Sequence, residues 1–234
     1  MVDTDAWQAP LRALARVTAN VRRHTRMGSL LTLTIVFVLT TLATSDLMGA
    51  ARAEAPAGTL EIRLASGTTL EQRGREQLER LLATHDLSRW LFTRTVQIQS
   101  RVIPHSHPVL TLNTQYLDND AAQLASFLHE QLHWFLVQNQ AKLASAVTAL
   151  ERLYPKVPEA APEGANGRGS TYLHLLVCLL EFDAVRAVLG ETTARATLGA
   201  FGYYTWVYRE VLERPEAIRQ ILRTQGLDVP DARR

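Results

Sequence analysis

Cysteine is almost absent from this chain of 234 residues. Cys178 is the one cysteine, so no disulfide can form within the chain, even in an oxidising compartment. A fold of this kind must rely on a packed apolar core. Residues 54–234 are long enough for one domain with a single core of that type.

An excess of positive charge is also missing from most of the chain. The formal net charge is +2, but residues 1–53 hold six Arg and three Asp, which leaves a net charge of −1 on residues 54–234. Binding to nucleic acid depends on clustered Lys and Arg side chains that neutralise phosphates. We therefore expect no nucleic-acid partner.

Long apolar runs are scarce as well. The run Leu30–Ala43 is short for a membrane span, which needs about 20 residues. It follows a basic cluster at 22–26 and precedes Ala51-Arg52-Ala53, a small-x-small cleavage site. This order is typical of a secretory signal, so residues 1–53 are predicted to be a signal peptide of a protein exported to the periplasm or the extracellular space. The alternatives are an uncleaved signal anchor, which would tether the protein to a membrane through residues 30–47, and a core helix.

The pattern of apolar residues predicts an α+β domain over residues 54–234, with a small N-terminal β region followed by a helical bundle. Alternating polarity and β-favourable residues predict strands at 59–65, 93–102 and 108–113. Apolar periodicity predicts helices at 69–83, 121–138, 140–153, 171–189, 192–213 and 215–225. Asp120 is the expected N-cap of the second helix. Tyrosines of the predicted helix 192–213 are expected to pack in the core, with a role in a substrate pocket as the alternative.

The segment His129–His133 has the pattern His-Glu-x-x-His, and no other segment indicates a chemistry as specifically. On a helix of 3.6 residues per turn, positions i and i+4 lie about 40° apart on one face. Two imidazoles placed in this way can bind one Zn²⁺ ion, and the Glu that follows the first of them lies beside the metal. The motif therefore predicts a zinc cofactor, with His129 and His133 as metal ligands and Glu130 as the general base.

The residues around the motif indicate a buried helix. Apolar side chains cover most of its circumference, at Leu124, Phe127, Leu128, Leu132, Phe135 and Leu136. A helix that is apolar nearly all round is a buried one, and two imidazoles and a carboxylate in it need partners, which a metal supplies. The alternative is a core helix whose histidines bond to backbone carbonyls, in which case Glu130 also needs a buried partner.

A catalytic zinc ion usually has three protein ligands and a water, and the predicted helix 171–189 offers two candidates for the third ligand. Glu181 lies in a strongly apolar run, where a carboxylate must be paired or metal-bound. His174 precedes it by seven residues on the same face, about 10.5 Å away along the axis. We expect Glu181 to be the third ligand. His174 is then the alternative ligand, a donor that stabilises the transition state, or a core histidine.

With this motif and a Glu on a later helix, residues 108–185 resemble the gluzincin branch of the zincin metallopeptidases. In that family a small sheet precedes the active-site helix, and its edge strand pairs with the peptide substrate. The resemblance implies that Glu181 completes the zinc site, that Asn113 at the end of the third predicted strand binds the substrate backbone, and that Tyr172 stabilises the oxyanion. One departure is Val185, which stands where the family often has a carboxylate.

The function that the sequence favours is a zinc-dependent metallopeptidase acting on a peptide or protein substrate. Zinc lowers the pKa of a bound water toward about 7, Glu130 takes its proton and passes it to the leaving amine, and Tyr172 or His174 helps to stabilise the oxyanion. Two other functions stay open. One is an exported, non-catalytic zincin-like domain that binds an envelope partner, and the other is a metal-assisted hydrolase of a non-peptide amide.

Overall fold

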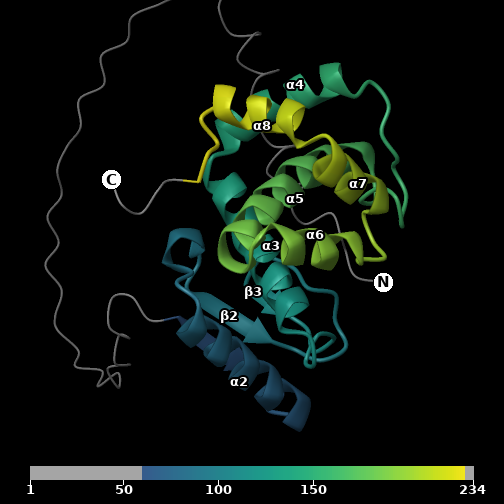
Figure 1. Ribbon diagram of the computed structural model, residues 1–234. Helices are drawn as coiled ribbons and strands as arrows, with labels where there is room; N and C mark the ends of the chain where they lie inside the picture. The colour runs from purple at the N-terminus through teal and green to yellow at the C-terminus, as the bar shows by residue number, and fades with distance from the viewer. Residues whose placement is uncertain (1–59, 230–234) are drawn as a thin grey trace, which may run out of the picture. The chain divides into compact units, whose positions relative to one another are not determined.

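The computed structural model describes residues 60–229 and has an α+β fold, as the sequence predicts, with seven α-helices and a three-stranded sheet in these residues (Figure 1). The predicted signal segment 1–53 lies outside the described residues, so its assignment stays a prediction. No helix within residues 60–229 has the length and apolar character needed to cross a membrane.

The sheet is entirely parallel, and its strands lie in the order β1-β2-β3. Val96 and Ile98 of the central strand are fully buried, whereas Thr95 and Gln97 are partly exposed, so helices cover one face of the sheet. Parallel strands need a crossover connection, and a helix supplies the first one. The elements of this region are β1 (Glu61–Leu64), α2 (Thr69–Thr84), the 3₁₀ helix η1 (Ser88–Trp90), β2 (Thr95–Ile98) and β3 (Leu110–Leu112).

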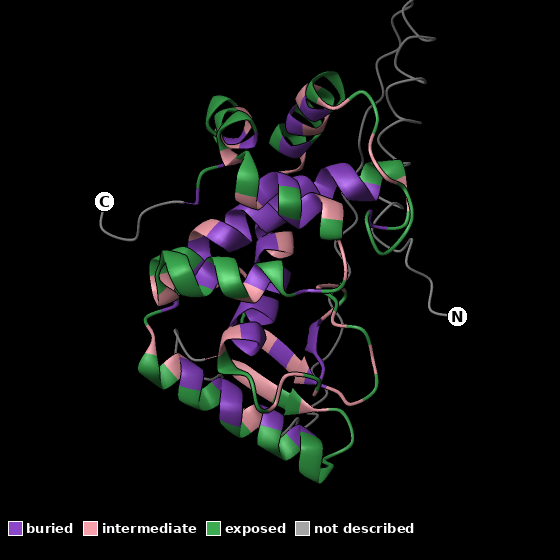
Figure 2. Cartoon of the chain, turned by 45° about the vertical axis from the view of Figure 1, so that its right-hand side comes forward, coloured by how far each residue is buried: buried purple, intermediate pink, exposed green. Residues whose placement is uncertain are grey.

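The helical region is built around two long helices that cross at its centre, α3 and α5 (Figure 1). Most residues of both are buried, and Figure 2 shows the buried residues concentrated in these central helices and the exposed ones on the outer helices. The apolar circumference predicted for the motif helix is therefore confirmed. The helices of this region are α3 (Asp120–Gln138), α4 (Gln140–Leu153), α5 (Arg168–Leu189), α6 (Glu191–Gly199), α7 (Thr205–Glu213) and α8 (Pro215–Thr224).

Two helix boundaries differ from the predictions. The N-cap of α3 is Asn119, whose side chain accepts from the backbone of Ala122, while the expected cap Asp120 bonds to Gln77 and Arg80 instead. The predicted helix 192–213 is two helices, separated by residues 200–204, and Tyr204 at the end of this break has a left-handed backbone conformation with φ of 51°. A right-handed helix cannot contain such a residue.

Polar side chains on α3 fix this helix against the sheet. Gln131, inside the motif and fully buried, accepts from the backbone N–H groups of Phe92 and Thr93 and donates to the carbonyl of Thr93. Trp134 donates its indole N–H to the carbonyl of Ser106 at 2.8 Å. The motif helix is thus held in one rotation by the segments that lead into β2 and β3.

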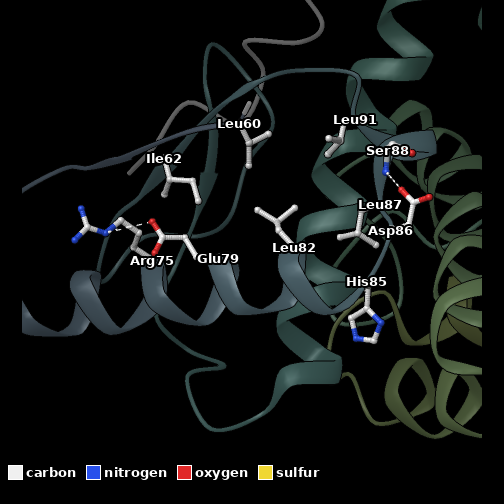
Figure 3. A pocket seen from close by; sticks show the side chains of 10 residues that line it. All are labelled: Leu60, Ile62, Arg75, Glu79, Leu82, His85, Asp86, Leu87, Ser88 and Leu91. Carbon is white, nitrogen blue, oxygen red and sulfur yellow. Dashed lines mark hydrogen bonds and ion pairs between the residues drawn. The ribbon is translucent and has the colours of Figure 1, made fainter. Parts of the chain in front are cut away.

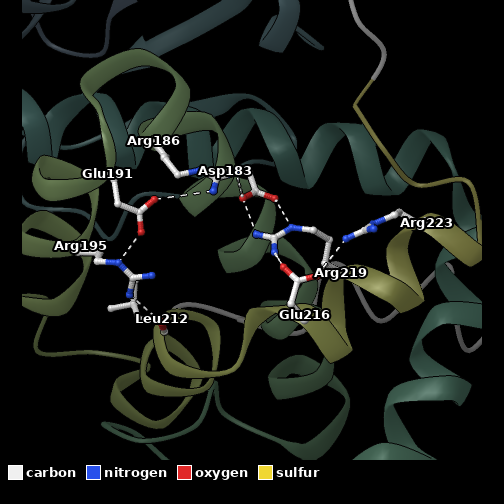
Figure 4. A network of polar contacts seen from close by, with 8 residues as sticks. All are labelled: Asp183, Arg186, Glu191, Arg195, Leu212, Glu216, Arg219 and Arg223. Atoms are coloured by element: carbon white, nitrogen blue, oxygen red, sulfur yellow. Dashed lines mark hydrogen bonds and ion pairs between the residues drawn. The ribbon is translucent and has the colours of Figure 1, made fainter.

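A network of charged residues joins α5 to α8 on the surface (Figure 4). Asp183 accepts two hydrogen bonds from Arg219, at 2.7 and 3.2 Å, and one from Arg186 at 3.0 Å. Arg219 also bonds to Glu216, whose side chain is 75% exposed, whereas that of Arg219 is 16% exposed. Asp183 therefore has a structural role and lies outside the histidine-bearing face of α5.

We expect Asp183→Asn to lower the free energy of unfolding by about 1–2 kcal/mol, because it removes a paired, partly buried carboxylate from Arg219. Glu216→Gln, which removes a much more exposed partner of the same Arg, should change it by less than about 0.5 kcal/mol. Urea unfolding of the two variants measures both values. Equal effects would show that the contact between α5 and α8 does not depend on Asp183.

Candidate metal centre

Three histidines from two helices converge on one point. His129 and His133 lie on one face of α3, and the separation between their Nε2 atoms is 3.2 Å. His174 of α5 completes the group, since one ring nitrogen from each histidine lies within 4.8 Å of the others. The Nδ1 atom of His174 bonds to the carbonyl of Ser170 at 2.7 Å, which leaves its Nε2 for the shared point.

Glu181 meets the same cluster from its other side. Its Oε2 atom lies 2.9 Å from Nδ1 of His129, and the Tyr208 hydroxyl donates to the same oxygen at 3.0 Å. Glu181 is 1% exposed and His129 is 7% exposed. Both candidates for the third ligand therefore lie close to His129. Glu181 contacts its Nδ1 atom, whereas His174 belongs to the histidine group in which Nε2 of His129 faces Nε2 of His133. A carboxylate that bonds to the second nitrogen of a histidine fixes its tautomer and its orientation.

Burial controls the charge of the three imidazoles. Burial, together with the charge of His129, lowers the pKa of His174 to about 3. Burial and the charges of His129 and His174 hold the pKa of His133 well below its ordinary value. Burial alone would lower the pKa of His129 too, but the Glu181 carboxylate reverses the effect and raises it well above the ordinary value. His133 and His174 are therefore neutral at physiological pH, the form in which imidazole binds metals.

Glu130 follows His129 on the same helix turn and is 6% exposed. Among the described residues, its carboxylate forms no hydrogen bond or ion pair. Burial raises the pKa of Glu130 to about 7, with His129 acting in the opposite direction and Glu181 in the same one. A carboxyl group with a pKa near neutrality can both accept and return a proton.

Tyr204 covers the cluster from the turn between α6 and α7. Its ring centroid is 4.3 Å from that of His174 and 6.3 Å from that of His129. Burial raises the pKa of Tyr204, and the charge of Glu130 contributes to the shift, so the hydroxyl stays protonated. Within residues 60–229 this hydroxyl has no hydrogen-bond partner, so it is an unused donor on a ring that packs against His174.

Cys178 and Tyr208 complete the surroundings of His129. Cys178, His129 and Glu181 also lie within 4.8 Å of one another through single ligand atoms. Burial raises the pKa of Cys178 to about 11, so its thiol is protonated and a poor ligand. The sequence assigned the tyrosines of this region to packing. In the sequence, the spacing of Tyr204 and Tyr208, four residues apart, was the one signal that could have linked them to the site, although Tyr204 lies just outside α7.

Two residues predicted for the site have other contacts in the structure. Tyr172 is fully buried and donates its hydroxyl to the carbonyl of Tyr154 at 2.6 Å. It lies two residues before His174, about 200° around the helix, so it faces away from the histidines. The structure therefore does not bring Tyr172 to the cluster, and Tyr204 is the tyrosine whose ring packs against His174.

Asn113 lies at the carboxyl end of β3, away from the segment before β3 that contacts Trp134. Its amide donates to the carbonyl of Val102 and accepts from the N–H of Gln115, so it holds the loops around β3 together. The free side of β3 is also partly filled, since both backbone groups of Thr111 pair with His105. A peptide cannot pair there as it does with a gluzincin edge strand.

Two surface cavities of the described chain lie apart from the histidines. One of about 520 Å³ is formed by β1, α2 and the segment around η1, with Leu60, Leu82 and His85 among its lining residues (Figure 3). Another of about 250 Å³ contains Arg101 and Asn113. His129, His133 and His174 line neither of them. His129, Glu130 and His174 are each 7% exposed or less, so the site is nearly closed, and His133 and Tyr204 are its partly exposed members.

The chain matches no family model, no curated protein and no solved structure. The chemistry of the site therefore has to be argued from its geometry. Nitrogen ligands about 2.0–2.1 Å from a tetrahedral zinc ion lie about 3.3 Å apart, and the 3.2 Å between the two Nε2 atoms of α3 fits this spacing. A proton shared by His129 and His133 explains the same distance, but it does not explain why the neutral imidazole of His174 also comes to this point.

We expect Tyr172→Phe to lower the free energy of unfolding by about 1–2 kcal/mol, because the carbonyl of Tyr154 loses its donor. Zinc affinity should stay within twofold of that of the unmodified protein, because Tyr172 faces away from the histidines. Urea unfolding and competition with a chromophoric chelator measure the two quantities. If Tyr172→Phe left the free energy of unfolding unchanged but weakened zinc binding, Tyr172 would have a role in the metal site.

Proposed function

We propose that the protein is a zinc-dependent peptidase whose metal is held by His129, His133 and His174. The observation that carries the proposal is the convergence of three ring nitrogens within 4.8 Å, two of them 3.2 Å apart, next to a buried carboxylate. The three ligands leave a fourth position for water, which is the arrangement of catalytic rather than structural zinc sites.

In this proposal Glu181 orients a ligand instead of binding the metal. Its bond to Nδ1 of His129 directs the Nε2 atom of that ring toward the metal position, and such carboxylate–histidine pairs also make the ligand more basic. This assignment differs from the expectation from sequence, which gave Glu181 the third position and His174 the alternative.

The catalytic roles follow from the positions of the remaining groups. Bound zinc supplies a water of lowered pKa and polarises the carbonyl of the substrate. Glu130 accepts the proton of that water and returns it to the leaving amine. The Tyr204 hydroxyl, carried by a ring that packs against His174 and protonated at neutral pH, would donate to the developing oxyanion.

A second function is favoured by the burial of the site. His129, Glu130 and His174 are each 7% exposed or less, and a closed zinc site is typical of structural zinc. In that case the protein is a non-catalytic zinc-binding domain that binds a partner protein, as the sequence also allowed. The two functions differ in what they require of Glu130.

Zinc titration tests the ligand set. The full chain should bind one Zn²⁺ per molecule, and His129→Ala, His133→Ala and His174→Ala should each weaken binding by on the order of 100-fold or more, because three protein ligands become two. Glu181→Gln should cost about 10–100-fold. Cys178→Ala is the control and should retain zinc. If Cys178→Ala lost zinc and His174→Ala retained it, the metal would belong to the group formed by His129, Cys178 and Glu181.

Hydrolysis tests the role of Glu130. Glu130→Gln should bind zinc as the unmodified protein does and lose about 10²–10⁴-fold in the rate of cleavage of a mixed peptide pool, since it removes the general base. Glu151→Gln, an exposed substitution on α4, is the matched control and should cleave normally. A zinc-loaded protein that cleaves no peptide with or without Glu130 would favour the non-catalytic function.

A further inference from the structure

A buried chain of hydrogen bonds extends the candidate metal centre from α5 to α7. The Oε2 atom of Glu181 lies 2.9 Å from Nδ1 of His129 and accepts the Tyr208 hydroxyl at 3.0 Å. As whole residues, Glu181, His129 and Tyr208 are 1%, 7% and 3% exposed. A carboxylate at this depth obtains hydrogen-bond donors only from the protein, and among the described residues these two side chains supply them.

We propose that Tyr208 is a positioning residue of the metal centre, which holds the Glu181 carboxylate in the orientation that directs His129 toward the metal. The proposal rests on the proposed function, because it expresses the effect of Tyr208 as an affinity for zinc. It assigns a role in metal binding to α7, a helix that contributes no ligand.

The physical reason lies in the geometry of the shared oxygen. Glu181 has several side-chain torsions, and a single bond from His129 does not fix all of them. The bond from Tyr208 comes from a different helix and holds the carboxylate from a second direction. Without it the carboxylate rotates more freely, the Nδ1 contact loosens, and the Nε2 atom of His129 is less often in the ligating position.

Tyr203, in the segment just before α7, provides a matched control. Its ring centroid is 6.1 Å from that of Tyr208, but among the described residues the tyrosine hydroxyl that donates to Glu181 is that of Tyr208. Tyr203→Phe and Tyr208→Phe each remove one hydroxyl from the same aromatic cluster. They differ in whether the hydroxyl bonds to the carboxylate.

Zinc affinity of the full chain, measured by competition with a chromophoric chelator, tests the proposal. Tyr208→Phe should weaken binding by about 10-fold or more, and Tyr203→Phe by less than twofold. In a Glu181→Gln background, Tyr208→Phe should have little further effect, because the two residues act through one path. The Co²⁺-loaded Tyr208→Phe protein should also show altered visible absorption, since the geometry of a ligand changes.

The outcomes separate this inference from the proposed function. Zinc binding by the unmodified chain that Tyr208→Phe leaves unchanged would overturn the inference and leave the proposed function standing. If Tyr208→Phe weakened zinc binding equally in the unmodified and the Glu181→Gln proteins, Tyr208 would act through packing, and the inference would be overturned too. If the unmodified chain bound no zinc, both would fall.

A measurement on the unmodified protein avoids any dependence on whether the variants fold. Added zinc should slow hydrogen exchange of the α7 amides at 205–213 more than that of the α8 amides at 215–224, because only α7 is joined to a ligand through Glu181. Equal protection of the two helices would contradict the proposed path.

Discussion

The contact between Glu181 and His129 is the interaction on which the rest of the site depends. It joins the two most buried helices, α3 and α5, at a point where a carboxylate or an imidazole alone would be costly to bury. Because each residue satisfies the other, the pair fixes how far one helix is shifted along the other. The position of α5 along α3 determines which residues of α5 lie opposite the motif, and it places His174 next to His129 and His133.

The sequence predicted the order of the elements and the residues of the motif, because both depend on local patterns. The α+β arrangement, the limits of α3 and α4 and the face shared by His129 and His133 follow from periodicity and the helix repeat. The choice between Glu181 and His174 could not be made in this way. Both lie on one stripe of α5, and only the shift of α5 against α3 determines which of them reaches the shared point.

Several contacts depend on segments that are far apart in sequence, and local patterns give little sign of them. Gln131 looks like a neutral filler inside the motif, yet it holds α3 to the segment before β2. The break at Tyr204 contradicts a continuous helical pattern, because a tertiary position for its ring outweighs the helical preference of its neighbours. Asn119 and Asp120 are both good caps, and the pairing of Asp120 with α2 leaves the capping to Asn119.

Burial of the cluster has two consequences for the proposed hydrolase. Charges act more strongly on one another where water is excluded, which favours the stabilisation of a developing oxyanion by Tyr204 and the metal. The same burial limits the approach of a substrate. His133 and Tyr204 are the members of the cluster that keep contact with solvent, so a peptide that reaches Glu130 has to arrive between α3 and the turn before α7. In the proposed hydrolase the residues that admit the substrate would also bind the metal and the oxyanion, whereas Glu181 and Tyr208 lie more deeply buried and contact His129 from the protein interior.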